Sequence, residues 1–147
     1  MVDVGAKRAT AREAAAEGSI RMSLATLRAI EAGQLPKGDA ISPAETAGVL
    51  AAKLTPHLLP LCHVVPFSGA VVEATCDPGL PGVRVTATVR GKAATGFEME
   101  ALVAVSAALL TIYDMAKATD PGMVIGEIAL RSKAGGKSGK WEREAPY

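Results

Sequence analysis

The stretch PLCHVVPFSG, residues 60–69, places Cys62 beside His63 in a chain with two cysteines and two histidines. Such a pair could belong to a metal site, could act as a nucleophile with its base, or could form a turn that only looks reactive. A zinc site needs three or four ligands, and the remaining candidates, Cys76 and His57, complete no CxxC or HxxxH unit. We therefore expect no metal here. The spacing leaves open whether His63 acts in chemistry or satisfies backbone groups in a turn.

Two carboxylates, Glu100 and Asp114, lie on one strip of the most apolar segment of the chain. Their spacing of fourteen residues brings them within roughly 40° of each other around a helix, but separates them by roughly 21 Å along its axis. Small residues between them would let a backbone or a ligand approach closely: Ala104, Ala107 and Thr111. The two carboxylates cannot act on one bond within one chain, whereas a symmetric contact between two subunits could join the two ends.

Lysines accompany the second carboxylate. Lys117 follows Asp114 by three residues, so the two side chains are neighbours on a helix. They can form an ordinary solvated ion pair, or they can tune each other's protonation in a cleft, as acid–base catalysis requires. Another lysine, Lys37, stands in the glycine-flanked loop LPKGDAI. The residue types alone do not decide between these interpretations.

The segment RSKAGGKSGKW, residues 131–141, is similar to the end of a phosphate-binding P-loop at its GKS step. Arg131 occupies the position of the motif's first glycine, and we expect too few following residues for the helix that the motif requires. A Walker loop is therefore not expected. The lysines among the glycines could clamp phosphate or could belong to a flexible surface tail; they are Lys133, Lys137 and Lys140.

These side chains must be positioned by helices and strands, and the first half of the chain has clear signals for both. Residues 10–22 are expected to be extended, and a helix follows with Ser23 as its N-cap and Gly33 as its stop. A second helix should begin at the sequence SPAE, in which Ser42 is the N-cap and Glu45 completes a capping box. We expect this helix to run until Pro56 interrupts it.

The second half of the chain alternates strands with a long helix. Residues 71–76 and 83–90 flank the turn sequence DPGLPG, which predicts an antiparallel pair. A helix over residues 97–117 is apolar at nearly every interior position and should be buried on most sides, and residues 123–131 form a last strand. One face of the second strand is apolar: Val83, Val85, Ala87 and Val89. The mixed order predicts an α+β fold with an antiparallel sheet covered by helices.

Composition limits the function classes. The 147 residues, taken as a single domain over 1–147, carry a net charge of +1 with 21% charged residues, which favours neither a nucleic acid nor an anionic membrane as the main partner. Hydrophobic residues make up 49%, and the mean hydropathy is +0.24, which suggests a face buried against other subunits. The longest apolar run, residues 101–112, is too short for a membrane span. The start MVDVGAKRAT has no signal core, so we expect a cytoplasmic protein with reduced cysteines.

Five segments, in this order, carry a resemblance to a known family: MVDVGAK, PKGD, LLPLCHVVPFSG, ATGFEMEALVAVSAALLTIYDMAKATD and MVIGEIALRSKAGGKSGKW. Together they cover nearly the whole chain at compatible spacing. The chain resembles the cyclic pyranopterin monophosphate synthase (MoaC) family, the accessory protein C of molybdenum cofactor biosynthesis. It departs from the family in LCHVV, where LCHPL is usual, and at Ala116, where a cysteine is usual.

The resemblance implies a ferredoxin-like α+β subunit in a homohexamer, a trimer of dimers with active sites at the dimer interfaces. It also implies a lyase that rearranges 3′,8-cyclo-7,8-dihydro-GTP into cyclic pyranopterin monophosphate and releases pyrophosphate. No cofactor and no metal are expected. Asp114, Lys117 and Lys37 match the family's catalytic residues. The implied substrate-binding residues are Leu61, Cys62, His63, Met99, Glu100, Arg12, Lys7 and Lys133.

An alternative remains from a different class, a non-catalytic oligomeric module that binds a nucleotide. A module that only binds would not need the carboxylate of Asp114 near a triphosphate, because like charges repel.

Overall fold

The computed structural model of the protein describes residues 1–144, and the last three residues of the expected domain 1–147 lie outside this range. Eight elements follow in chain order. They are strand β1 (Thr10–Arg21), helices α1 (Leu24–Glu31) and α2 (Ile41–Leu58), strands β2 (Gly69–Asp77) and β3 (Gly82–Ala93), helix α3 (Glu98–Ala116), and strands β4 (Val124–Ala134) and β5 (Trp141–Glu142).

The strands form one antiparallel sheet in the order β2-β3-β1-β4-β5. If the short helix α1 and the short strand β5 are set aside, the order of elements is β-α-β-β-α-β, and β1 and β4 lie side by side in the sheet. This is the split βαβ arrangement of the ferredoxin-like fold. The expected α+β fold is therefore confirmed.

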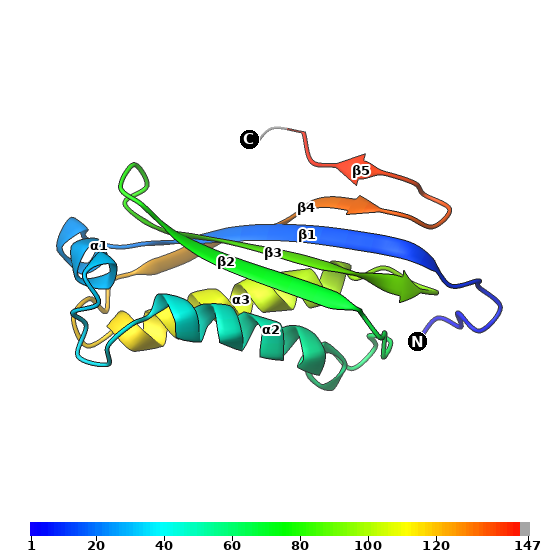
Figure 1. The fold of residues 1–147 in the computed structure, drawn as a ribbon, viewed down its shortest axis with the longest axis horizontal. Coiled ribbons are helices and arrows are strands. Elements are labelled where there is room, and N and C mark those ends of the chain that lie inside the picture. Colours follow the sequence, from blue (N-terminus) through cyan, green and yellow to red (C-terminus); the bar gives the residue numbers. More distant parts are fainter. Residues whose placement is uncertain (145–147) are drawn as a thin grey trace.

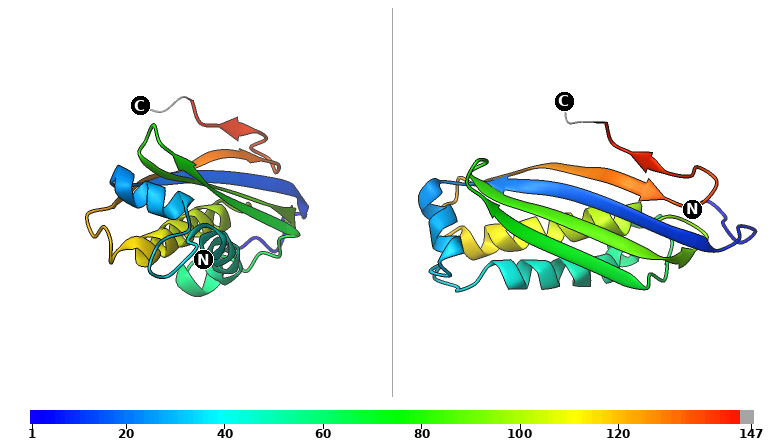
Figure 2. Two further views of the ribbon diagram at one scale, coloured as in Figure 1. Left: turned by 60° about the vertical axis from the view of Figure 1, so that its left-hand side comes forward. Right: turned by 45° about the horizontal axis from the view of Figure 1, so that its top comes forward.

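Helices α2 and α3 lie next to each other on one face of the sheet (Figures 1 and 2). The predicted apolar face of β3 is directed at them, and its four side chains are at most 1% exposed: Val83, Val85, Ala87 and Val89. The described helices leave the opposite face of the sheet uncovered (Figure 2). The core thus lies between the sheet and this pair of helices.

Helix α1 has the predicted ends. The hydroxyl of Ser23 accepts a hydrogen bond from Thr26 N–H, and Gly33 has a φ of 64°, in the left-handed region that favours glycine. The expected start of α2 is wrong. Asp39, and not Ser42, accepts hydrogen bonds from the first N–H groups of the helix, those of Ile41 and Ser42, at 2.9 and 3.3 Å.

Two further expectations for α2 also fail. Glu45 completes no capping box, because its Oε1 accepts a hydrogen bond from Ala74 N–H on β2 at 3.0 Å. Pro56 does not end the helix, which continues to Leu58, and Leu59 N–H still bonds to the carbonyl of Thr55. Pro56 lacks the N–H of an ordinary helical residue, but the hydrogen bond from Leu59 to Thr55 keeps the last turn closed.

Helix α3 is the buried helix that the sequence predicts, at Glu98–Ala116. The strip of small residues on it is used within the chain. A side chain at Gly48 of α2 would lie 3.0 Å from the carbonyl oxygen of Ala104, so only glycine allows this approach. By length and composition alone α3 could cross a membrane, a property that it shares with many core helices, and here it packs on the sheet and α2.

The glycine-lysine segment after β4 forms a turn and a short strand. Gly135, Gly136 and Gly139 have positive φ values, and Trp141 pairs with Lys133 of β4. The sequence did not predict β5.

Candidate active site

Lys37, Asp114 and Lys117 meet at one end of the molecule, where the α1–α2 loop passes the C-terminal end of α3 (Figure 1). The Nζ of Lys37 lies 2.6 Å from Oδ2 of Asp114, and the Nζ of Lys117 lies 2.7 Å from Oδ1. Each carboxylate oxygen thus faces one ammonium group. The three residues that the family resemblance marks as catalytic form one cluster.

The loop that carries Lys37 is fixed on both sides. Leu35 is buried in the core, Gly38 has a φ of 86°, and Asp39 binds the start of α2. These anchors leave Lys37 little freedom along the backbone. The side chain of Lys37 extends from this anchored backbone to Asp114.

The charges in this cluster reinforce each other. The hydrogen bonds from Lys117 and then from Lys37 lower the pKa of Asp114 to about 2. In return, Asp114 raises the pKa of Lys117 above its usual range. The pKa of Lys117 is therefore shifted away from neutrality, because its carboxylate partner favours the charged ammonium form. All three side chains are about half exposed, so the cluster is accessible to a ligand.

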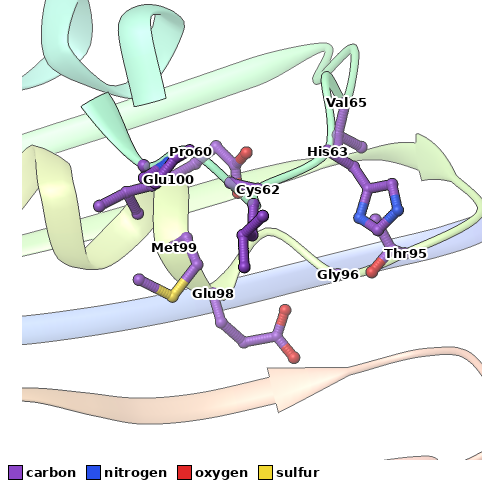
Figure 3. Close-up of a pocket in the computed structure, with 11 residues that line it drawn as sticks. Pro60, Cys62, His63, Val65, Thr95, Gly96, Glu98, Met99 and Glu100 are labelled. Carbon is purple, nitrogen blue, oxygen red and sulfur yellow. The ribbon is translucent and has the colours of Figure 1, made fainter. Parts of the chain in front are cut away.

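A pocket of about 470 Å³ lies near the other end of α3. Figure 3 shows the turn residues Pro60, Cys62 and His63 on one side, and Glu98 and Met99 on the other. Eleven residues line it: Leu59, Pro60, Leu61, Cys62, His63, Val65, Thr95, Gly96, Glu98, Met99 and Glu100. Five of the predicted substrate-binding residues are among them.

Glu100 is the most unusual of these residues. Its side chain is 2% exposed, and its Oε1 has no hydrogen-bond partner among residues 1–144. Burial raises its pKa, and the charge of Glu98 adds to this effect. A buried carboxyl group without a full set of partners is uncommon in proteins.

The turn residues differ in their contacts. The Nε2 of His63 lies 2.6 Å from the carbonyl oxygen of Val2, so the N-terminal segment holds this ring at the pocket. Burial, and then the charge of Glu100, raise the pKa of the Cys62 thiol, which opposes a role as a thiolate nucleophile. The structure thus places Cys62 and His63 in a turn that lines the pocket.

The predicted basic residues differ in their relation to this pocket, and none of the three lines it. The Nζ of Lys133 lies 3.0 Å from Oε1 of Glu98, which lines the pocket. The guanidinium of Arg12 donates hydrogen bonds to the carbonyls of Ala93 and Ala94, which directly precede the pocket residue Thr95. Lys7 is exposed in the N-terminal segment that also contacts His63.

The candidate site residues thus form two groups, one at each end of α3. Residues 100 and 114 are roughly 21 Å apart along the helix axis. We call the lysine–aspartate group the catalytic cluster (Lys37, Asp114, Lys117) and the other group the Glu100 pocket (the eleven lining residues). Within one subunit the two groups are separate.

Sequence reasoning missed three contributors. Glu98 binds Lys133, Val2 holds His63 through a backbone carbonyl, and Asp39 anchors the loop of Lys37. Only Asp39 had a signal, since an aspartate before a helix is a common cap. Within residues 1–144, no three His, Cys, Asp or Glu side chains are grouped so that they could hold a metal ion.

Comparison with known proteins gives the family. The profile of the MoaC family matches residues 1–136. A cyclic pyranopterin monophosphate synthase from Nostoc sp. is 55% identical over 146 residues, which cover 99% of this chain and 87% of that protein. Those of Chloroflexus aurantiacus and Cereibacter sphaeroides are 53% identical over 143 residues and 52% identical over 145 residues. These two matches cover 97% and 99% of this chain, and 88% and 91% of the relatives. The chain belongs to the MoaC family.

Proposed function

We propose that this protein is a lyase of molybdenum cofactor biosynthesis, which converts 3′,8-cyclo-7,8-dihydro-GTP into cyclic pyranopterin monophosphate and releases pyrophosphate. The observation that carries this proposal is the identity of more than 50% with cyclic pyranopterin monophosphate synthases over nearly the whole chain. Every residue that the family pattern marks as catalytic is present. The catalytic cluster supplies the acid–base groups that such a rearrangement needs.

In the proposed reaction, Asp114 is the proton acceptor of the catalytic cluster. Its low pKa keeps it ionised at neutral pH, so it enters the reaction as a carboxylate. Lys117 and Lys37 enter as ammonium groups, which can donate protons and can stabilise negative charge on phosphate oxygens. Binding of the anionic substrate between these lysines would loosen their contacts with Asp114 and free the carboxylate to act.

The Glu100 pocket is the proposed binding site for the rest of the substrate. Leu61, Cys62, Met99 and Glu100 would contact the ring system, and His63 stands beside them. Arg12, Lys7 and Lys133 would bind the triphosphate. Lys133 binds the pocket residue Glu98, and Arg12 binds the carbonyl of Ala94, next to the pocket residue Thr95.

A complete site would then require two subunits. One substrate cannot contact the catalytic cluster and the Glu100 pocket of the same chain, because they are roughly 21 Å apart along α3. A two-fold contact between subunits would bring the cluster of one chain to the pocket of the other. We propose a cytoplasmic homohexamer, a trimer of such dimers. Exposed apolar side chains on the helical layer support an assembly: Leu50, Leu54, Leu58 and Leu110.

A coupled turnover assay tests this function. Purified protein receives freshly prepared 3′,8-cyclo-7,8-dihydro-GTP, and release of pyrophosphate is followed together with formation of the pterin product. We expect both products from the wild type and neither from Lys37→Ala. Tight binding of the substrate without turnover would contradict the proposal and would favour the non-catalytic nucleotide-binding module.

A further inference from the structure

Asp120 joins two parts of the chain that meet at the catalytic cluster. It lies in the loop that follows α3, the helix of Asp114. Its Oδ2 accepts hydrogen bonds from the N–H of Ser23 at 2.9 Å and from the hydroxyl of Thr26 at 3.2 Å. Both partners belong to the start of α1, and Figures 1 and 2 show α1 beside the C-terminal end of α3. Asp120 therefore fastens α1 to the end of α3.

The backbone around Asp120 is itself held against α3. The N–H of Asp120 donates to the carbonyl of Ala116, in the last turn of the helix, at 3.0 Å. The hydroxyl of Tyr113, the residue directly before Asp114, donates to the carbonyl of Pro121 at 2.9 Å. These two hydrogen bonds fix the position of the Asp120 carboxyl group relative to Asp114.

On its other side, α1 leads into the loop that carries Lys37. Leu27 and Ile30 of α1 are buried, and α1 packs on β3. Within residues 1–144, the side-chain hydrogen bonds that link α1 and its N-cap to other elements all end on Asp120. Apolar packing has little directional preference, whereas a hydrogen bond fixes a distance and an angle. Asp120 is therefore the contact that sets where α1 and the loop after it lie relative to α3.

We propose that Asp120 is a positioning residue, which holds α1 so that the following loop presents Lys37 to Asp114. This assignment rests on the proposed function, in which these two side chains act together, and adds to it a residue outside the catalytic cluster. The path from Asp120 through α1 and its loop to Lys37 closes at the contact of 2.6 Å with Asp114. A shift of α1 would open this contact, and a misplacement of about 1 Å can lower a rate about 10²-fold.

Two other roles for Asp120 differ from this one in what they predict. A carboxylate that only stabilises the start of α1 would contribute to stability and leave the catalytic cluster unchanged. A carboxylate that acts by its charge would act on Lys117, three residues before it in the chain, and would need its negative charge. Variants of Asp120 distinguish the three roles.

The pKa of Asp114 is the first readout, because it reports the contact with Lys37 and needs no substrate. Lys117 and Lys37 are the charged groups that face Asp114, and both lower its pKa. We expect Asp120→Ala to raise this pKa by at least about half of the rise that Lys37→Ala produces. In a chain that already carries Lys37→Ala, Asp120→Ala should add no further rise. Carboxyl-carbon NMR titration of the full-length protein measures these values.

Either of two results in this titration overturns the assignment. An Asp114 pKa that Asp120→Ala leaves unchanged would show that Asp120 does not maintain the contact with Lys37. A rise of the same size with and without Lys37 would show that Asp120 acts by another route.

Turnover of the proposed substrate gives the second readout. We expect kcat of Asp120→Ala to fall at least about tenfold while KM stays within about threefold, because Asp120 does not line the Glu100 pocket. Asp120→Asn keeps one acceptor oxygen for Ser23 and Thr26 and removes the charge, so it should recover most of kcat. If Asp120→Asn is as slow as Asp120→Ala, the charge of Asp120 matters and the hydrogen bonds to α1 do not explain its role.

Asp77→Ala is the matched control for a general loss of stability. Asp77 also accepts hydrogen bonds at a turn, from the N–H of Gly79 at 2.9 Å and from Arg84 at 2.6 Å. Its replacement should lower the free energy of unfolding and leave both the pKa of Asp114 and kcat as in the wild type. If Asp77→Ala changes them as much as Asp120→Ala does, loosening of the whole fold explains the effect and the assignment fails.

Thr26→Val decides the question if Asp120→Ala does not fold. It removes the hydroxyl that binds Asp120 and nearly keeps the shape of the side chain, so it should move the Asp114 pKa and kcat in the same directions. No change in either property would overturn the assignment.

The two readouts also separate this assignment from the proposed function. A protein that never forms product, but shows the expected pKa changes, would keep the role of Asp120 in placing Lys37 and lose the function. A protein that forms product, with an Asp114 pKa unaffected by Asp120→Ala, would keep the function and remove the role of Asp120.

Discussion

The Nζ of Lys37 lies 2.6 Å from Oδ2 of Asp114, although 77 positions separate them in the sequence. Lys117, only three residues from Asp114, binds the other carboxylate oxygen at 2.7 Å. Asp114 is thus held between one cation from its own helix and one from a distant loop. This arrangement lowers the pKa of Asp114, raises that of Lys117, and makes the acid–base assignment testable.

Replacement of the carboxylate should abolish most of the activity. Asp114→Asn keeps the shape of the side chain but cannot accept a proton near neutral pH, so we expect turnover to fall on the order of 10²-fold or more. Asp77→Asn is the matched control, because Asp77 is also a surface carboxylate with a cation 2.6 Å away, from Arg84. The control should retain wild-type turnover. A loss of only a fewfold in Asp114→Asn would contradict the role of Asp114.

The pKa of Asp114 provides a second test, which needs no substrate. Carboxyl-carbon NMR titration should give a pKa of about 2, and Lys117→Met should move it upward toward the ordinary value of 3.8. Because the folded-state pKa is depressed, the ion pairs stabilise the fold above pH 3.8, and this contribution is lost as the pH falls toward 2. Lys53→Met, an exposed change on α2, should leave the pKa unchanged. An unshifted pKa in Lys117→Met would show that Lys117 does not control Asp114.

The fold was largely predictable because its signals are local. The alternation of Val83, Val85, Ala87 and Val89 predicted the buried face of β3, and the apolar run predicted α3. The start of α2 was predicted wrongly because two capping residues, Asp39 and Ser42, compete within four positions, and local sequence does not rank them. The short β5 has a weak signal, since two residues form a strand only through their partner on β4.

The sequence predicted which residues belong to the catalytic cluster, but it did not predict all of the contacts between them. The spacing of Asp114 and Lys117 on a helix predicted one of the two ion pairs. Contact with Lys37 depends on how a loop 77 residues away is folded back, which no local pattern encodes. The small residues of α3 were compatible with close approach of either a ligand or another backbone. In the structure, the backbone of α2 at Gly48 packs closely against α3 at Ala104.

Asp39 should be important for the position of Lys37. Asp39→Ala removes the acceptor for the first N–H groups of α2, so we expect the melting temperature to fall by about 2–4 °C. Turnover should fall as well, because the loop of Lys37 loses an anchor. Asp39→Ser restores a good capping residue and should recover most of both losses. If Asp39→Ala changed neither property, the loop would have to be held by Leu35 and Gly38 alone.

Glu100 should reduce the stability of the ligand-free protein at neutral pH. Its folded-state pKa is raised, so the protonated form is favoured in the fold, and stability is lost as the pH rises above the value of 4.5 for an unperturbed glutamate. Glu100→Gln cannot ionise. We therefore expect it to be more stable than the wild type at pH 8, by about 1–3 kcal/mol, with a smaller difference at pH 4. Denaturant unfolding at both pH values measures this, and a pH-independent difference would contradict the proposed burial of a titrating carboxyl group.

A shared active site predicts that two inactive variants complement each other. Lys37→Ala disables the catalytic cluster and His63→Ala alters the Glu100 pocket, so a dimer with one chain of each contains one site built from two intact halves. After subunit exchange at equal amounts, about a quarter of all sites should be intact, and activity should return to about that fraction of wild type. A mixture of Lys37→Ala with Asp114→Asn is the control, because both changes lie in the same half and no intact site can form. If mixed oligomers form, as native mass spectrometry can verify, and the first mixture stays as inactive as the control, each site belongs to a single chain.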